Sequence, residues 1–224
     1  MRAAVLNEVF EQFAADELTQ FFRTIERGVI EQRPHSRSIL HSLFINWLDT
    51  SSQWQERLAE LPNAPLVAHL RHMSHYDVAD AWQIFDPKDY VFPDDRMLTL
   101  GERRARARRP DPQTIEAFLY DPDRLVATHL LQNTRITQKH VIRMACRRPT
   151  TGSVLRSIFE SRKYGLSRDI MLALVQNPYT PYQVAFGLVF LLSQTELKEL
   201  VSIESLSPML KRMVIHLHDM RRTN

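Results

Sequence analysis

Apolar residues recur at helical spacing along almost the whole chain, and two of these apolar stripes repeat each other. Residues 126–131 are apolar at their first, second, fifth and sixth positions, and residues 170–175 show the same arrangement 44 residues later. This i, i+1, i+4, i+5 pattern is typical of a buried helix face. Each stripe ends in Gln-Asn, and we expect Asn133 and Asn177 to close their helices in the left-handed conformation.

A second motif repeats at a slightly shorter spacing. The Arg-Arg-Pro run at 108–110 returns at 147–149, a shift of 39 residues. A period of 39 to 44 residues is typical of a helical-pair repeat. The pattern therefore predicts a right-handed α-solenoid of helical-pair repeats with units at 94–133, 134–177 and 178–222. We expect Thr137 and Thr180 to cap the helices that follow them.

The first ninety residues lack the arginine-proline motif but keep the helical spacing. They predict helices at 3–15, 17–32, 37–48, 52–61, 64–73 and 76–85. The three tryptophans, Trp47, Trp54 and Trp82, lie on apolar stripes, so we expect them in the core.

Two prolines, four aspartates and no helical period mark residues 86–95 as a connector. The chain is therefore predicted to be all-α. We expect an N-terminal helical cap region with its connector at 1–93 and helical repeats at 94–224.

Composition adds to this expectation without changing it. Five glycines in 224 residues leave little room for hairpins. A single cysteine, Cys146, excludes an internal disulfide, and its place in an apolar helix predicts a half-buried structural thiol. No apolar run is long enough for a membrane span, and a carboxylate comes too early at the N-terminus for a secretory signal, so we expect a cytoplasmic protein.

Charge is distributed unevenly between the two halves of the chain. Residues 1–100 carry 9 Lys and Arg against 15 Asp and Glu, whereas residues 101–224 carry 20 against 11. The basic excess falls in the segment 101–168, which contains the Arg-Arg-Pro runs. Equivalent positions of successive repeats stack side by side, so we expect an arginine ladder on one surface. It comprises Arg104, Arg106, Arg108, Arg109, Arg143, Arg147 and Arg148.

Two interpretations of the arginine ladder remain open at this point. Guanidinium groups match the oxygens of phosphates and carboxylates, which predicts a binding surface. Arginines in the last turn of a helix also stabilise its carbonyl end, which predicts a purely structural role. Only five of the 29 basic residues are lysines, so the arginines also reflect an arginine-biased composition.

Candidate chemistry is otherwise sparse. His69 and His72 lie one helical turn apart, and His75 or Asp77 would complete a metal site if the chain turned there. No glutamate stands where the general base of a zinc hydrolase is needed, and we expect a solvated helix face with no metal. Because no phosphate loop or nucleophile motif is present, we expect neither an enzyme nor a cofactor.

One segment carries a resemblance to known families. The run Asn-Pro-Tyr-Thr-Pro-Tyr-Gln-Val-Ala at 177–185 resembles the N-P-x-T-P-x-x-V core of leucine-rich repeat variant proteins, and the long period is similar to HEAT-like repeats. The resemblance implies an α-solenoid that binds other macromolecules. The cysteine cluster that holds an iron–sulfur centre in some variant-repeat proteins is missing here, so that cofactor is not implied. HEAT-like DNA glycosylases are a distant alternative, because the repeat region contains no tryptophan.

These observations predict a non-catalytic binding module or scaffold in a bacterial cytoplasm. We expect a protein partner with an acidic surface, attracted by residues 101–168 and contacted by Tyr179 and Tyr182. The alternative is a nucleic-acid-binding protein that uses the same arginines on phosphates. Self-association between the acidic and basic halves of two copies is a further possibility.

Overall fold

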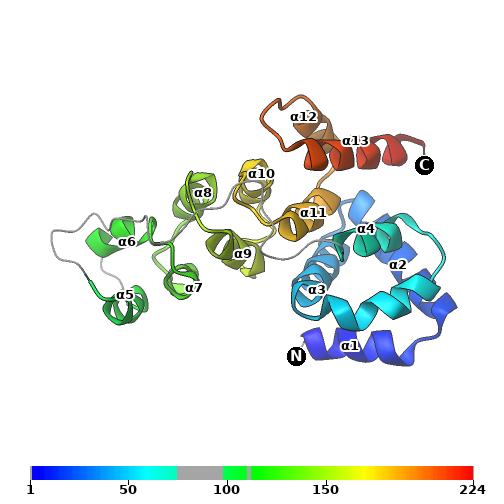
Figure 1. The fold of residues 1–224 in the computed structure, drawn as a ribbon, viewed down its shortest axis with the longest axis horizontal. Coiled ribbons are helices and arrows are strands. Elements are labelled where there is room, and N and C mark those ends of the chain that lie inside the picture. The colour runs from blue at the N-terminus through cyan, green and yellow to red at the C-terminus, as the bar shows by residue number, and fades with distance from the viewer. Residues whose placement is uncertain (1, 75–97, 110–111, 224) are drawn as a thin grey trace. The chain divides into compact units, whose positions relative to one another are not determined.

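The described part of the chain is entirely helical. The computed structural model describes residues 2–74, 98–109 and 112–223, which form thirteen α-helices and no strand (Figure 1). The predicted all-α class is therefore confirmed for these residues. Within the same residues, no helix is both long and apolar enough to cross a membrane.

The helices divide into two compact units. Unit 1 comprises residues 1–80 and 182–224, and unit 2 comprises residues 81–181. The predicted helix at 76–85, the connector at 86–95, Trp82 and the predicted boundary at residue 93 lie outside the described residues.

Unit 1 joins four N-terminal helices to three C-terminal ones. They are α1 (Arg2–Gln12), α2 (Ala15–Ile30), α3 (Pro34–Glu60), α4 (Pro65–Met73), α11 (Tyr182–Leu191), α12 (Gln194–Val201) and α13 (Pro208–Thr223). The predicted break between residues 48 and 52 is wrong, because α3 runs through it as one helix of 27 residues. Trp47 and Trp54, two turns apart on α3, are both buried with ring centres 5.6 Å apart, so one apolar stripe continues across the polar segment between them.

Helix α11 lies at the centre of unit 1. All of its residues from Gln183 to Leu191 are buried, as expected for a helix that is apolar on every side. It packs on α3, α4 and α13 (Figure 1). Gly187 allows the close approach to α3, because a Cβ atom there would lie 3.2 Å from the Phe44 ring. The apolar core of unit 1 therefore depends on a helix supplied from the far end of the chain.

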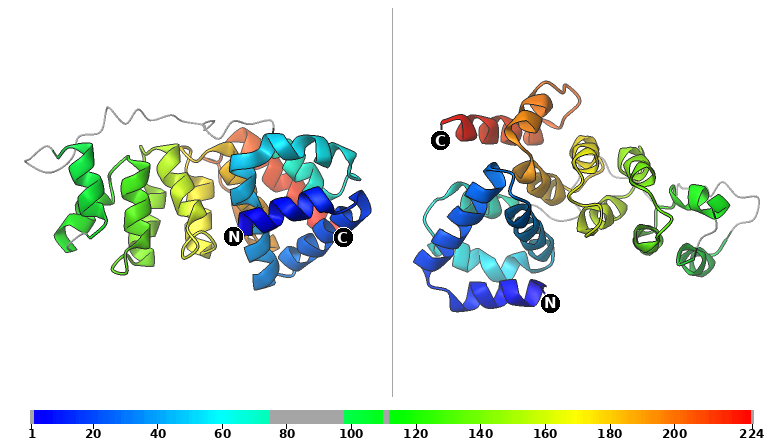
Figure 2. Two further views of the ribbon diagram at one scale, coloured as in Figure 1. Left: turned by 90° about the horizontal axis from the view of Figure 1, so that it is seen from below. Right: turned by 180° about the vertical axis from the view of Figure 1, so that it is seen from behind.

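The described residues of unit 2 form six short helices. They are α5 (Leu100–Ala107), α6 (Pro112–Phe118), α7 (Arg124–Gln132), α8 (Gln138–Cys146), α9 (Gly152–Glu160) and α10 (Arg168–Gln176). Helix α7 packs between α5 and α9, and α8 packs against α10. The helices consequently alternate between two rows, α5, α7 and α9 in one and α6, α8 and α10 in the other (Figures 1 and 2).

Each of the three predicted units holds three described helices rather than the predicted pair. Among the described residues, the unit predicted at 94–133 holds α5, α6 and α7, and the unit at 134–177 holds α8, α9 and α10. The unit predicted at 178–222 holds α11 to α13, which belong to unit 1. Because three is odd and the rows alternate, helices related by the sequence repeat in unit 2 lie in opposite rows.

Both repeated asparagines end a helix, but not in the predicted conformation. Asn133 and Asn177 follow the last residues of α7 and α10 with φ of −73° and −85°, which is extended backbone. Each side-chain Oδ1 instead accepts a hydrogen bond from the backbone N–H two residues later. Thr137 caps α8 as predicted, whereas Thr180 donates its hydroxyl back to Leu174 O of α10.

Arginine side chains close the carboxyl ends of several helices. A glycine with positive φ is the usual device at such an end, but no described glycine has positive φ. Guanidinium groups donate instead to carbonyl oxygens in the last turn of a helix or just beyond it. The arginines that do so are Arg57 at α1, Arg71 at α3, Arg147 just beyond α6, Arg148 at α10 and Arg221 at α11.

Arg221 offers the clearest test of these caps. Its two terminal nitrogens each donate at 2.6 Å, to Phe190 O and Leu192 O, and its guanidinium lies over the Phe190 ring. The guanidinium group is largely removed from water, and this burial lowers the pKa of Arg221 to about 10. We expect Arg221→Met to lower the free energy of unfolding by about 2 to 3 kcal/mol, because two buried carbonyls lose their donors.

The matched control is Arg222→Met, which removes the exposed neighbouring arginine. Its effect should stay within about 0.5 kcal/mol. Chemical denaturation followed by circular dichroism measures both values, and equal losses in the two variants would contradict a capping role for Arg221.

Candidate functional site

The predicted arginine ladder is divided between two helices that are not stacked on each other. Arg104 and Arg106 lie on α5 and Arg108 directly follows it, whereas Arg143 lies on α8 and Arg147 follows that helix. Helix α5 packs on α6 and α7, and α8 packs on α9 and α10. The expected side-by-side ladder therefore does not match this packing, and each group has its own surroundings.

Arg104 links α5 to α7 through an ion pair with Asp123. Its Nε and Nη2 atoms donate to the two carboxylate oxygens of Asp123 at 3.0 and 2.8 Å. Asp123 also caps α7, because it accepts the backbone N–H groups of Leu125 and Val126. The hydrogen bond from Arg104 is the main cause that lowers the pKa of Asp123, so the carboxylate stays ionised.

A tyrosine and two arginines form a half-exposed cluster between α6 and α8. Arg143 donates to the Tyr120 hydroxyl at 2.9 Å and pairs with Glu116 at 2.7 Å. Arg147 donates to the Tyr120 carbonyl oxygen, and its guanidinium carbon lies 5.2 Å from the centre of the Tyr120 ring. We call these four residues the Tyr120 cluster. Tyr120 keeps 37% of its surface exposed, so its ring remains available to a partner.

Sequence reasoning named Arg143 and Arg147 but missed Tyr120 and Glu116. The sequence repeat points to Tyr120 as a position of interest. Tyr164 lies 44 residues after it, which is the same shift that relates α7 to α10. Tyr164 is buried and donates its hydroxyl to Ile136 O at 2.6 Å. The two equivalent tyrosines thus differ in exposure, and only Tyr120 is surrounded by arginines.

Arg148, Tyr179 and Tyr182 are three further predicted binding residues, and each has other contacts than those of the Tyr120 cluster. Arg148 donates to Gln176 O, and Tyr179 is half-buried in the loop after α10. Tyr182 is the first residue of α11 in unit 1, where it stacks on Phe186 with ring centres 5.7 Å apart. Tyr179 and Tyr182 therefore belong to different units.

Among the described residues of unit 2, exposed cations outnumber available carboxylates. Every acidic side chain described between residues 101 and 169 has a hydrogen-bonding or ionic partner: Glu102, Glu116, Asp121, Asp123, Glu160 and Asp169. Arg106 and Arg109 are exposed and have no partner among the described residues, and Arg108 reaches only His129 at 3.5 Å. The described surface of unit 2 therefore presents positive charge that no described carboxylate neutralises.

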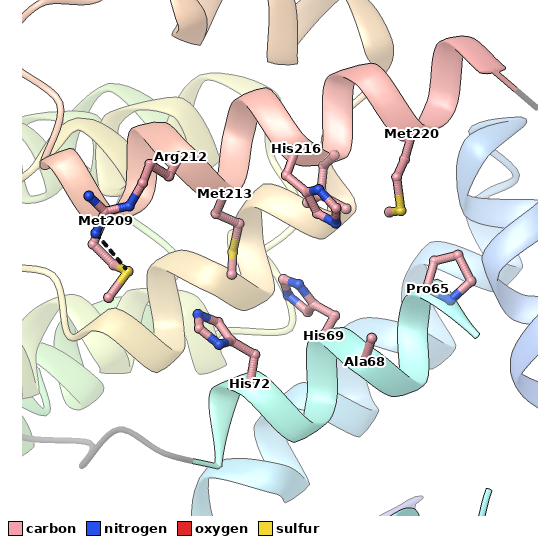
Figure 3. Close-up of a pocket in the computed structure, with 10 residues that line it drawn as sticks. Pro65, Ala68, His69, His72, Met209, Arg212, Met213, His216 and Met220 are labelled. Atoms are coloured by element: carbon pink, nitrogen blue, oxygen red, sulfur yellow. Dashed lines mark hydrogen bonds between the residues drawn. The ribbon is translucent and has the colours of Figure 1, made fainter. Parts of the chain in front are cut away.

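Unit 1 contains a cavity of about 360 Å³ between α4 and α13 (Figure 3). Both helices pack on α11, and the cavity opens between them. Its walls are mostly apolar, and they include three methionines of α13. The lining residues are Pro65, Ala68, His69, His72, Met209, Arg212, Met213, His216, Leu217 and Met220.

His69 is buried in the wall of this cavity rather than solvated as predicted. Its Nε2 atom lies 2.8 Å from Phe186 O, and its ring packs 4.7 Å from that of Phe190. A carbonyl oxygen only accepts, so Nε2 carries the proton. Burial lowers the pKa of His69 to about 3, which keeps the imidazole neutral at physiological pH.

The metal hypothesis for these histidines finds no support among the described residues. His75 and Asp77 lie outside them, and within the described part no three His, Cys, Asp or Glu side chains are grouped to hold a metal ion. The prediction for Cys146 is wrong, because this last residue of α8 is exposed. Its side chain lies on the solvent side of the apolar stripe formed by Val141, Met144 and Ala145.

The neutral state of His69 predicts acid-sensitive stability. The unfolded chain takes up a proton at His69 below its ordinary pKa of 6.5, whereas the folded chain does not until about pH 3. Stability contributed by His69 is thus complete above pH 6.5 and falls as the pH drops toward 3, by about 2 kcal/mol at pH 5. Other titrating groups also contribute, so the comparison must be with a variant.

His69→Gln keeps an N–H donor for Phe186 O but does not titrate. We expect the difference in unfolding free energy between the native protein and this variant to shrink by about 2 kcal/mol between pH 7.5 and pH 5. Urea denaturation at the two pH values measures it. A difference independent of pH would show that His69 is protonated in the folded state or is not buried.

Comparisons with known proteins identify no relative of this chain. No family model, no curated protein and no solved structure matches it. The resemblance of residues 177–185 to variant repeats therefore stays a prediction that rests on that motif. The described part of the chain is all-helical, and its helices pack largely on near neighbours in sequence.

Proposed function

We propose that this chain is a non-catalytic helical-repeat module that binds an acidic protein partner through unit 2. The observation that carries the proposal is the Tyr120 cluster, in which an exposed tyrosine ring is flanked by two guanidinium groups. Tyrosine and arginine are the residues that most often dominate the energy of protein interfaces. The cluster is held in place by its own hydrogen bonds, so little conformational entropy is lost on binding.

Charge in unit 2 supports an acidic partner. Arg106 and Arg109 are exposed without a described partner, and the acidic side chains nearby are engaged. Positive charge of this kind accelerates the encounter with an acidic surface and fixes its orientation.

Exposed apolar side chains favour a protein over a nucleic acid. In the described part of unit 2, the large apolar residues with the most exposed surface are Leu100, Tyr120 and Leu125. Leu100 begins α5 and Leu125 lies on α7, two helices that pack on each other. A protein interface buries such residues at its centre, whereas a phosphate backbone offers them no complement.

The two-row arrangement of unit 2 supports a solenoid-like binding surface. Short helices that bury their facing sides against neighbours in the same row leave their outer sides free for a partner. In this proposal, α5 to α10 are two units of a three-helix repeat, and α11 to α13 are a divergent third unit that has become part of unit 1.

Nucleic-acid binding remains the second candidate. It is favoured by one observation, the exposed arginines 106 and 109 that have no described carboxylate partner. Phosphate contacts would release counterions, so affinity would fall steeply with salt. An interface with an apolar centre would depend on salt much less.

The test compares labelled acidic peptides, with and without aromatic residues, against labelled duplex DNA and single-stranded RNA. We expect fluorescence anisotropy to show binding of the aromatic acidic peptides at both low and high salt. Arg143→Ala should weaken that binding about tenfold, because it removes the charge and the hydrogen bond that hold Tyr120.

Arg162→Ala is the matched control, because Arg162 is an exposed arginine of the same unit with no described partner. Both variants must retain native circular dichroism. Equal weakening in the two variants would contradict a role for the Tyr120 cluster. Steep, salt-dependent binding of DNA or RNA without peptide binding would replace the proposal with the nucleic-acid alternative. A molecular mass that halves in high salt would identify a second copy of the chain as the partner.

A further inference from the structure

We propose that the cavity between α4 and α13 binds a small amphiphile with an apolar body and a single carboxylate. This ligand site lies within unit 1 and is independent of the binding surface proposed for unit 2. A volume of about 360 Å³ is within the range of pockets that enclose small organic molecules.

The walls determine that the body of the ligand is apolar. Pro65 and Ala68 of α4 face Met213 and Met220 of α13 across the cavity (Figure 3), and Leu217 of α13 also lines it. His69 adds no charge to this interior, because it is neutral and its Nε2–H is bonded to Phe186 O. An apolar chain or ring that fills the space removes this surface from water, and that burial favours binding.

The methionines make the cavity adaptable to different apolar shapes. Met209, Met213 and Met220 all come from α13, and Figure 3 shows their thioethers extending from this helix toward the α4 side. Methionine is unbranched and polarizable, so it adjusts to irregular partners at low cost. We therefore expect selectivity for the charge of the ligand rather than for one apolar skeleton.

The charged group of the ligand is determined by Arg212. Among the described residues that line the cavity there is no Asp or Glu, and Arg212 is the one that is permanently charged. Its only described partner is the weakly accepting sulfur of Met209, at 3.7 Å from Nη2. A guanidinium fork matches a carboxylate with two parallel hydrogen bonds, which a thioether does not provide. The apolar walls and this single cation together select a monocarboxylate over an alcohol or an amine.

The experiment uses decanoate, decanol and decylammonium as probes of the full-length chain. We expect isothermal titration to show that decanoate binds at least about tenfold more tightly than the other two. Arg212→Gln should weaken decanoate binding about tenfold and leave decanol unaffected, because only the carboxylate contacts the guanidinium. Lys211→Gln, the neighbouring cation of α13 that does not line the cavity, is the control and should change neither.

Methionine methyl NMR locates the ligand directly. The chain has eight methionines, and decanoate should shift the methyl signals of Met209, Met213 and Met220 without moving those remote from the cavity. Met213→Trp should fill the cavity and abolish binding, and Ala68→Phe does the same from α4 if the first variant does not fold.

Several results would overturn the inference. Equal binding of decanoate, decanol and decylammonium would remove the role of Arg212. Shifts spread over all methionine methyls would indicate nonspecific surface binding. Absence of binding by every probe, in a protein with native circular dichroism, would show that the cavity takes no amphiphile.

Discussion

The fold depends on bonds between guanidinium groups and the carbonyl oxygens at helix ends. Every α-helix leaves its last carbonyls without an intrahelical donor, and a chain of many short helices therefore has many such groups to satisfy. In this chain no described glycine adopts the left-handed conformation that closes most helices, and the one described residue with positive φ is Gln32. Arginine is suited to the task, because one planar group reaches two or three oxygens at once, as Arg71 does at the end of α3.

The need to satisfy carbonyl oxygens at helix ends gives the arginine-rich composition a structural explanation. A lysine ammonium is a compact charge without the planar fork, so the strong preference for arginine follows in part from the capping task. Arg147 and Arg148 close helix ends, and Arg104 holds Asp123, so these members of the predicted ladder are already engaged within unit 2. The guanidinium group of Arg147 also lies over the exposed Tyr120 ring. This one residue can therefore stabilise the fold and shape the candidate binding surface.

The local features of the fold were predictable from the sequence, whereas their long-range arrangement was not. The apolar stripes ending at Asn133 and Asn177 mark the carboxyl ends of two helices, because burial periodicity and a terminal asparagine are both local signals. The number of helices in each predicted unit differs from the expected pair, because the repeated motifs mark α5, α7, α8 and α10 and none of them marks α6 or α9. The burial of His69 was also missed, because its neighbour Phe186 is 117 residues away in the chain.

Unit 1 is discontinuous, and this topology bears on how the chain acquires its structure. Helices α1 to α4 leave the ribosome more than a hundred residues before α11, the helix that covers Phe44 and accepts the bond from His69. During that interval an apolar surface has no native cover, which is the situation in which nascent chains aggregate or recruit chaperones. The described helices of unit 2 do not depend on a distant segment in this way, because they pack largely on near neighbours in sequence. Contacts of that kind form quickly. Synthesis therefore delivers unit 2 in a position to fold first, whereas unit 1 becomes complete only after α11 to α13 have been made.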